Sequence, residues 1–196
     1  GFNPDAVQAA ADMGTKVAWM SSINPQERSG DLPDSPRTII SDHTGKLLQK
    51  IIDVLDIVQH HEMVLASGDL DIADTMKIFA EAKKRGMNRL LVNDLSGTAR
   101  LEDLCDMRDL DVYFEHTFLP CTPSRGHITP EEMASCINSL GVERCVISTD
   151  FGQWMNPSPA EGMRMVIAEL LNVGMPKNSV AALTSTNPRK LVNFDF

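Results

Sequence analysis

Acidic side chains stand close to the ends of several apolar segments of this sequence. Asp69, Asp94 and Asp150 follow three such segments, and Glu115 and His116 end a fourth. The apolar runs are typical of strands buried in a parallel sheet, whose carboxyl ends share the edge where α/β proteins place their chemistry. Carboxylates and an imidazole that meet there can bind a divalent cation and activate a water molecule. We therefore predict a metal site with Asp69, Asp94 and Asp150 as ligands.

The same edge supplies the predicted catalytic residues Asp150, Glu115 and His116. Asp150 would take a proton from the attacking water, and Glu115 or His116 would orient the substrate. Each acid also has an ordinary structural interpretation, because Asp is favoured at helix N-caps and in turns. Asp69 and Asp94 could simply cap the helices that follow them. The occurrence of polar groups at four segment ends favours the metal site.

A recurring pattern predicts the elements that position these residues. At Gly14, Gly86 and Gly141 a helical stretch ends, a basic residue follows within three positions, and an apolar segment begins. Glycine suits the left-handed conformation that closes a helix. The predicted strands are 16–22, 63–68, 89–94, 111–118 and 145–150, and the predicted helices between them include 46–60, 70–85, 131–140 and 159–173.

Alternating strands and helices predict an α/β fold with right-handed crossovers. A (β/α) barrel has eight such units in about 250 residues, whereas this chain shows five in 196 residues. We predict one domain, residues 1–196, that forms a partial barrel lacking its N-terminal strands. The opening at Gly1, on a turn that leads into a helix, suits a cleaved chain or a fragment. A flavodoxin-like open sheet also fits the strand count, but no glycine-rich phosphate loop is present.

The composition limits the partners. The formal net charge is −9 and the pI about 4.9, which argues against nucleic acid and anionic membrane surfaces. No apolar run is long enough to span a bilayer and no segment resembles a signal peptide. Four cysteines without a CxxC spacing indicate reduced thiols. We expect a cytoplasmic protein with a small-molecule substrate.

Three segments carry a resemblance to a known family: "NPDAVQAAADMGTKVAWM", "GVERCVISTDFGQWMNPSPAEGM" and "STNPRKLV". Together they resemble the C-terminal five-strand part of an amidohydrolase-superfamily protein. The resemblance implies a TIM-barrel fold and metal-dependent hydrolysis by a metal-activated water. That superfamily binds its metal through a His-x-His on the first strand, one His after each of strands five and six, and an Asp after strand eight. Asp150, in its "STD" setting, matches the last of these ligands.

The other ligand positions depart from the superfamily pattern. Gly68-Asp69 stands where Gly-His is usual, and Asn93-Asp94-Leu95 stands where the second His is usual. A strand with His-x-His is absent from the sequence. Aspartate can replace histidine as an oxygen ligand, and it favours hard ions such as Mn²⁺ or Mg²⁺ over Zn²⁺.

Two functions follow from these observations. The first is an amidohydrolase-like enzyme whose missing strands come from an N-terminal segment or another chain. The second is a degraded homologue that acts as a structural or regulatory subunit, which the two histidine-to-aspartate changes favour. In both cases five barrel strands leave edges and apolar surface open. We therefore expect a homo-oligomer or a second chain that covers the open side.

Overall fold

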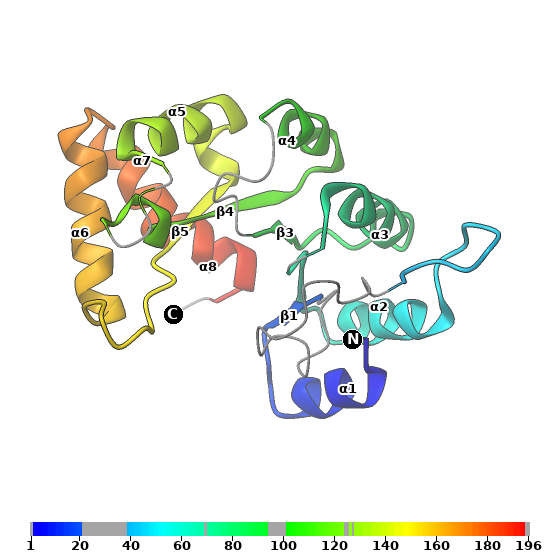
Figure 1. The fold of residues 1–196 in the computed structure, drawn as a ribbon. Helices are drawn as coiled ribbons and strands as arrows, with labels where there is room; N and C mark the ends of the chain where they lie inside the picture. The colour runs from blue at the N-terminus through cyan, green and yellow to red at the C-terminus, as the bar shows by residue number, and fades with distance from the viewer. Residues whose placement is uncertain are drawn as a thin grey trace. The chain divides into compact units, whose positions relative to one another are not determined.

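The structure is a computed structural model of the 196-residue chain (Figure 1). Contacts within the chain divide it into two compact units, Gly1–Asn93 and Asp94–Phe196. That the chain forms a single domain stays a prediction. The structure describes residues 2–20, 39–68, 70–93, 101–123, 126 and 128–194.

The first unit alternates helices with short parallel strands. Strand β1 pairs with β2 and β2 pairs with β3, both in parallel. Its elements are α1 (Pro4–Asp12), β1 (Val17–Trp19), α2 (Gln49–His60), β2 (Val64–Ala66), α3 (Ile72–Lys84) and β3 (Leu90–Val92). Strands β2 and β3 are buried along their whole length, as expected for parallel strands covered on both faces.

Local signals set the helix ends of this unit. Asn3 caps α1 by accepting the Ala6 N–H at 3.2 Å, and Asp71 caps α3 by accepting the Asp74 N–H at 2.8 Å. Gly86 follows α3 with φ +82°, the left-handed conformation predicted for it. Helix α1 packs against α2, as Figure 1 also shows. These ends direct the chain into β1, β2 and β3 with one common polarity.

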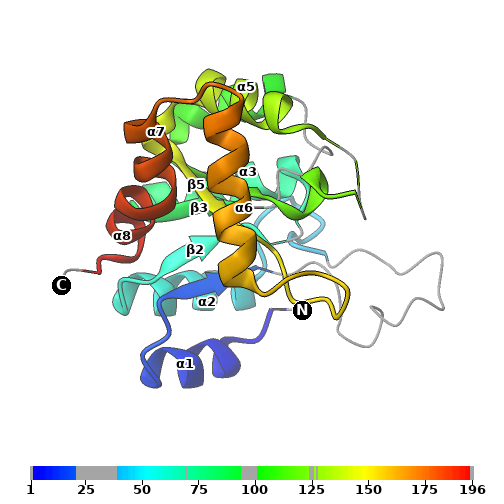
Figure 2. The ribbon, with the colours of Figure 1, turned by 90° about the vertical axis from the view of Figure 1, so that its left-hand side faces the viewer.

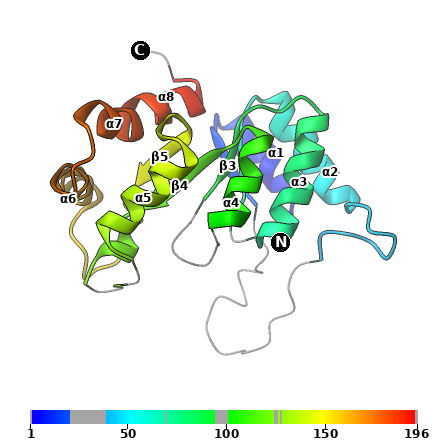
Figure 3. The same ribbon diagram turned by 90° about the horizontal axis from the view of Figure 1, so that it is seen from above.

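The second unit holds two parallel strands, β4 and β5, and the remaining helices. Its elements are α4 (Leu101–Met107), η2 (Arg108–Leu110), β4 (Tyr113–Thr117), η3 (Leu119–Cys121), α5 (Pro130–Leu140), η4 (Val142–Arg144), β5 (Cys145–Ser148), α6 (Pro159–Asn172), α7 (Lys177–Ala181), η5 (Ala182–Thr186) and α8 (Asn187–Val192). A complete capping box, Thr129 with Glu132, begins α5. The π-helical turn η5 joins α7 to α8, and this run lies beside β5 (Figures 2 and 3).

The two faces of β4 differ in what covers them. Phe114 pairs with Cys145, so both side chains lie on one face of the β4–β5 pair. Burial raises the pKa of Cys145, and the nearby Cys136 of α5 raises it further, which places this face against the helix. His116 shares this helix-covered face because it is two residues from Phe114, and Glu115 lies on the opposite face.

The predicted fold class is confirmed. The chain is α/β, with helices between five strands that all take part in parallel pairs. The four predicted helices correspond to α2, α3, α5 and α6, whereas α4, α7 and α8 were not predicted as elements. Strands β2, β4 and β5 are shorter than predicted, and the predicted strand ends at 21–22 and 94 lie outside the described residues. Among the described helices, none has the length and apolarity needed to cross a membrane.

Candidate active site at the carboxyl ends of the strands

Asp150 lies just beyond β5 in an unusual backbone conformation. Its φ is +53°, a left-handed value that costs energy for any residue with a Cβ. Its side chain is exposed. The turn around it is held by hydrogen bonds: Phe151 N–H donates to Thr149 Oγ1 at 3.2 Å, and Gln153 Nε2 donates to the Asp150 carbonyl at 3.1 Å. The carboxylate is therefore presented by an ordered turn.

The residue after Asp150 anchors this turn in the core. Phe151 is buried and packs against Gly162 of α6, where an added Cβ would lie 2.5 Å from the Phe151 ring. Its ring centroid also lies 6.0 Å from that of Phe118, which follows β4. Helix α6 begins only at Pro159, and the side chain of Ser158 accepts the Glu161 N–H. The N-cap of α6 is thus Ser158, and Asp150 is not needed for it.

Glu115 and His116 lie on opposite faces of β4 and are not brought together. His116 is only 4% exposed, on the helix-covered face, and burial lowers its pKa from 6.5 to about 4. Within the described residues its Nε2 atom has no hydrogen-bond partner. Glu115 is half-buried on the other face. A catalytic role for either residue stays a prediction.

In the first unit the strand ends are tied together by side-chain hydrogen bonds. Asn93 Oδ1 accepts the Gly68 N–H at 2.7 Å and the Ser67 hydroxyl at 3.1 Å, and Asn93 N–H donates to Ser67 Oγ at 3.1 Å. Gly68 has φ +63°, and a Cβ there would lie 1.5 Å from the Met20 carbonyl oxygen. Only glycine fits this contact between the ends of β1 and β2. No role for Asn93 was predicted from the sequence.

Two of the three predicted metal ligands, Asp69 and Asp94, lie outside the described residues. Among the residues that the structure does describe, no group of three His, Cys, Asp or Glu side chains could hold a metal ion. The described donors alone do not fit a divalent cation. The ligand set Asp69, Asp94 and Asp150 stays a prediction from the sequence.

Cys121 is the nucleophile candidate nearest in sequence to the end of β4. Burial, with a smaller contribution from the carboxylates of Glu132 and Glu131, raises its pKa to about 11. Because the thiolate is the reactive form, this thiol is a poor nucleophile at neutral pH. Covalent catalysis by Cys121 is therefore not favoured, and activated water is the better candidate nucleophile.

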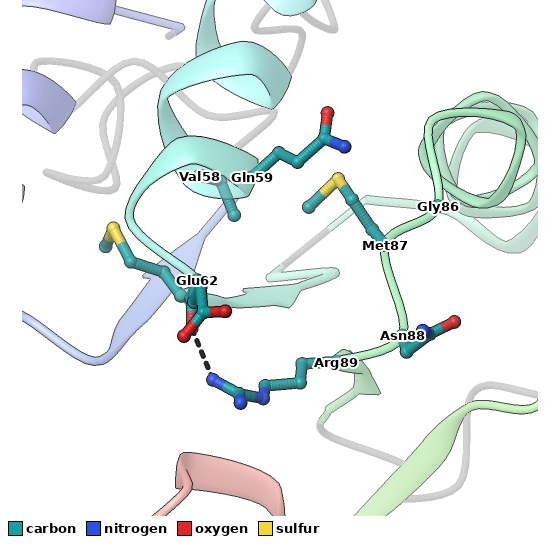
Figure 4. Close-up of a pocket in the computed structure, with 8 residues that line it drawn as sticks. Val58, Gln59, Glu62, Gly86, Met87, Asn88 and Arg89 are labelled. Carbon is teal, nitrogen blue, oxygen red and sulfur yellow. Dashed lines mark hydrogen bonds between the residues drawn. The ribbon is translucent and has the colours of Figure 1, made fainter.

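The pockets with defined linings lie at the other ends of the strands. One, of about 340 Å³, is lined by residues from the end of α2 and the segment before β3, and Arg89 Nη1 donates to the Glu62 carbonyl there at 2.6 Å (Figure 4). Another, of about 310 Å³, is lined by Val112, Arg144 and neighbours, which precede β4 and β5. In barrel folds the amino ends of the strands contribute stability and the carboxyl ends carry the chemistry. Neither pocket is therefore the candidate active site.

Solved structures with a similar fold are phosphotriesterase-like hydrolases of the TIM-barrel type. The phosphotriesterase homology protein from Escherichia coli, complexed with phosphate in its active site, has a TM-score of 0.61 and 15% identity, over 95% of this chain and 67% of that one. The organophosphorus hydrolase from Deinococcus radiodurans has a TM-score of 0.56 and 12% identity, over 91% and 54%. A protein engineered for organophosphate hydrolysis from a weak promiscuous lactonase template has a TM-score of 0.59 and 10% identity, over 98% and 65%.

These likenesses define the class of fold. It is of the (β/α)-barrel type, and the chain spans about half to two thirds of the length of these structures. The chain belongs to a family of unknown function, DUF6282, whose model matches residues 1–115. No curated protein matches the sequence.

Proposed function

We propose that this protein is a metal-dependent hydrolase of the amidohydrolase type that acts on a small molecule. The observation that carries the proposal is Asp150. An exposed carboxylate is held at the carboxyl end of β5 in a left-handed conformation, by a turn that Phe151 anchors against Gly162. Residues in sparsely populated backbone conformations cluster at active sites. Glu62, Asp111 and Asn193 have similar φ values at other turns of the chain, so the position of Asp150 at the end of β5 is the more specific part of the observation. The likeness to phosphotriesterase-like hydrolases supports the same conclusion.

In the proposed reaction the chain supplies a base and a fixed geometry. The oxygen of water forms a bond to the carbonyl carbon or phosphorus of the substrate, and the bond from that atom to the leaving group breaks. Asp150 accepts the proton of the water and returns it to the leaving group. A bound divalent ion, Mn²⁺, Mg²⁺ or Zn²⁺, would supply positive charge that makes the water more acidic. The proposed ligands are those predicted from the sequence: Asp69, Asp94 and Asp150.

The test compares the parent protein with Asp150→Asn and Asp150→Ala. Metal content is measured by mass spectrometry after dialysis against Mn²⁺ or Zn²⁺, and hydrolysis is measured on a panel of esters, lactones and phosphotriesters. We expect bound metal and hydrolysis in the parent, and loss of about 10²-fold or more of the rate in both variants. Asp109→Asn is the matched control, because that carboxylate is exposed in the same unit but lies before β4. Full metal binding and activity in both Asp150 variants would refute the proposal.

The second candidate function is a structural or regulatory subunit. It is favoured by Asp69 and Asp94, which stand where the superfamily pattern has histidines. For either function we propose a partner, a second copy or another chain, next to β1. Trp19 at the end of this strand is 57% exposed, and among the described strands β1 pairs only with β2. Sedimentation velocity on the parent and on Trp19→Ser distinguishes a stable assembly through β1 from a monomer.

A further inference from the structure

The Asn93 side chain is fixed in one orientation by its hydrogen bonds. The Gly68 N–H is a donor, so the atom that it reaches at 2.7 Å has to be the amide oxygen. The Ser67 hydroxyl at 3.1 Å strengthens this assignment, and Ser67 itself is buried. The Nδ2 group then occupies the other branch of the amide. The backbone donor therefore distinguishes between the two flipped orientations of the Asn93 amide, which would otherwise fit equally well.

Within the described part of the chain, the two Nδ2 hydrogens of Asn93 are available to another partner. The side chain is half-buried, and among the described residues the Asn93 amide nitrogen has no acceptor. It lies at the carboxyl end of β3, beside the Gly68 position that admits no Cβ. A donor that is already oriented before a ligand binds has a small reorganisation free energy. Such a donor is effective in stabilising an oxygen that gains negative charge.

We infer that Asn93 binds the substrate, with Nδ2 donating a hydrogen bond to a carbonyl or phosphoryl oxygen. This inference rests on the proposed hydrolase function and adds a substrate-binding residue and a substrate class to it. The class is an ester, because a fixed N–H donor is effective toward a carbonyl or phosphoryl oxygen that gains negative charge. Ser67 is a positioning residue, since it orients Asn93 and is buried away from solvent.

The experiment observes the amide directly. The side-chain NH₂ signal of Asn93 is followed by ¹⁵N–¹H NMR while trimethyl phosphate, an uncharged ester with a strong acceptor oxygen, is added with and without Mg²⁺. Asn93→Asp identifies the signal and keeps an oxygen for the Gly68 N–H, but it removes the donor. We expect a saturable shift of the Asn93 signal in the parent, binding about 10-fold weaker in Asn93→Asp, and binding about 3-fold weaker in Ser67→Ala.

The results separate this inference from the proposed function. An Asn93 signal that does not move, or an affinity unchanged in Asn93→Asp, overturns the inference even if the parent hydrolyses esters. A saturable shift in a protein that binds no metal and hydrolyses nothing supports the inference and refutes the hydrolase. If Asn93→Asp does not fold, the titrations of the parent and of Ser67→Ala still test the inference. A donor positioned by Ser67 predicts a shift of the Asn93 signal in the parent and weaker binding in Ser67→Ala. On a hydrolysed ester, kcat/KM is expected to fall about 10²-fold in Asn93→Asp.

Discussion

Replacing His116 by leucine is expected to remove much of the acid sensitivity of this protein. The imidazole is buried on the helix-covered face of β4, and within the described residues its Nε2 has no partner. Leucine has a similar volume and leaves no unpaired polar atom. His116→Gln is the second variant, because it keeps a polar side chain but cannot gain a proton.

The sign and size follow from the pKa of this group. Burial lowers the pKa of His116 from 6.5 to about 4, so between these values the unfolded chain binds a proton that the folded protein does not. The free energy of unfolding therefore falls as the pH falls below about 6.5, and this contribution levels off below about 4. Integrated over the titration, His116 lowers the free energy of unfolding by about 2 kcal/mol from pH 7 to pH 5, and by about 3 kcal/mol by pH 4.

The assay is urea unfolding followed by circular dichroism at pH 7, 6, 5 and 4, at one protein concentration. Relative to the parent, both His116 variants are expected to lose about 2 kcal/mol less stability between pH 7 and pH 5. His43→Asn is the control, because His43 lies exposed in a turn. The reasoning is refuted if the parent and both variants lose stability in parallel across this range.

Three further substitutions test the strand ends and the C-terminal helices by thermal or urea unfolding. Gly68→Ala places a Cβ against the Met20 carbonyl and should lower the free energy of unfolding by at least about 3 kcal/mol. Gly14→Ala is the control: its φ is also positive, at +85°, but the space around it is open, so the loss should be about 1 kcal/mol. Equal losses of stability in the two variants would contradict the close contact at Gly68. Asn187→Ala removes hydrogen bonds of 2.7 and 2.8 Å to the backbone carbonyl groups of Val142 in η4 and of Cys145 at the start of β5, and it should cost about 2 kcal/mol. An unchanged stability would show that water replaces these hydrogen bonds. Asp150→Ala should be about 1 kcal/mol less stable than Asp150→Gly, because only alanine is strained at φ +53°, and an equal stability would argue against that conformation.

Features with a local cause were predictable from the sequence. Gly86 and Gly141 close helices with φ of +82° and +100°, and Thr129 begins α5 with a capping box. Each depends on residues within one turn of itself, so a short stretch of sequence contains the whole signal. The alternation of apolar segments and amphipathic helices then determines an α/β fold with parallel strands.

Features with long-range causes were not predictable. The orientation of Asn93 depends on Ser67 and Gly68, which precede it by about 25 residues. The burial of His116 depends on which face of β4 the helices cover, and adjacent polar residues of one strand give no indication of that. Asn187, in the segment "STNPRKLV", joins α8 to the start of β5 by its amide, a structural role that a family resemblance does not reveal. The predicted ligands Asp69 and Asp94 lie outside the described residues.

Asn93 and Asp150 are fixed at strand ends by different means, and the difference bears on function. Asn93 is held by hydrogen bonds that also join β2 to β3, so a purely structural protein would benefit from keeping it. Asp150 is held in a left-handed conformation that costs about 1 kcal/mol relative to glycine, and its neighbours Phe151 and Gly162 provide the packing that keeps the turn in place. Glycine at position 150 would keep that packing and relieve the strain. The exposed carboxylate at the end of β5 is the feature of this turn on which the proposed hydrolase depends, and the Asp150 variants described above test that dependence directly.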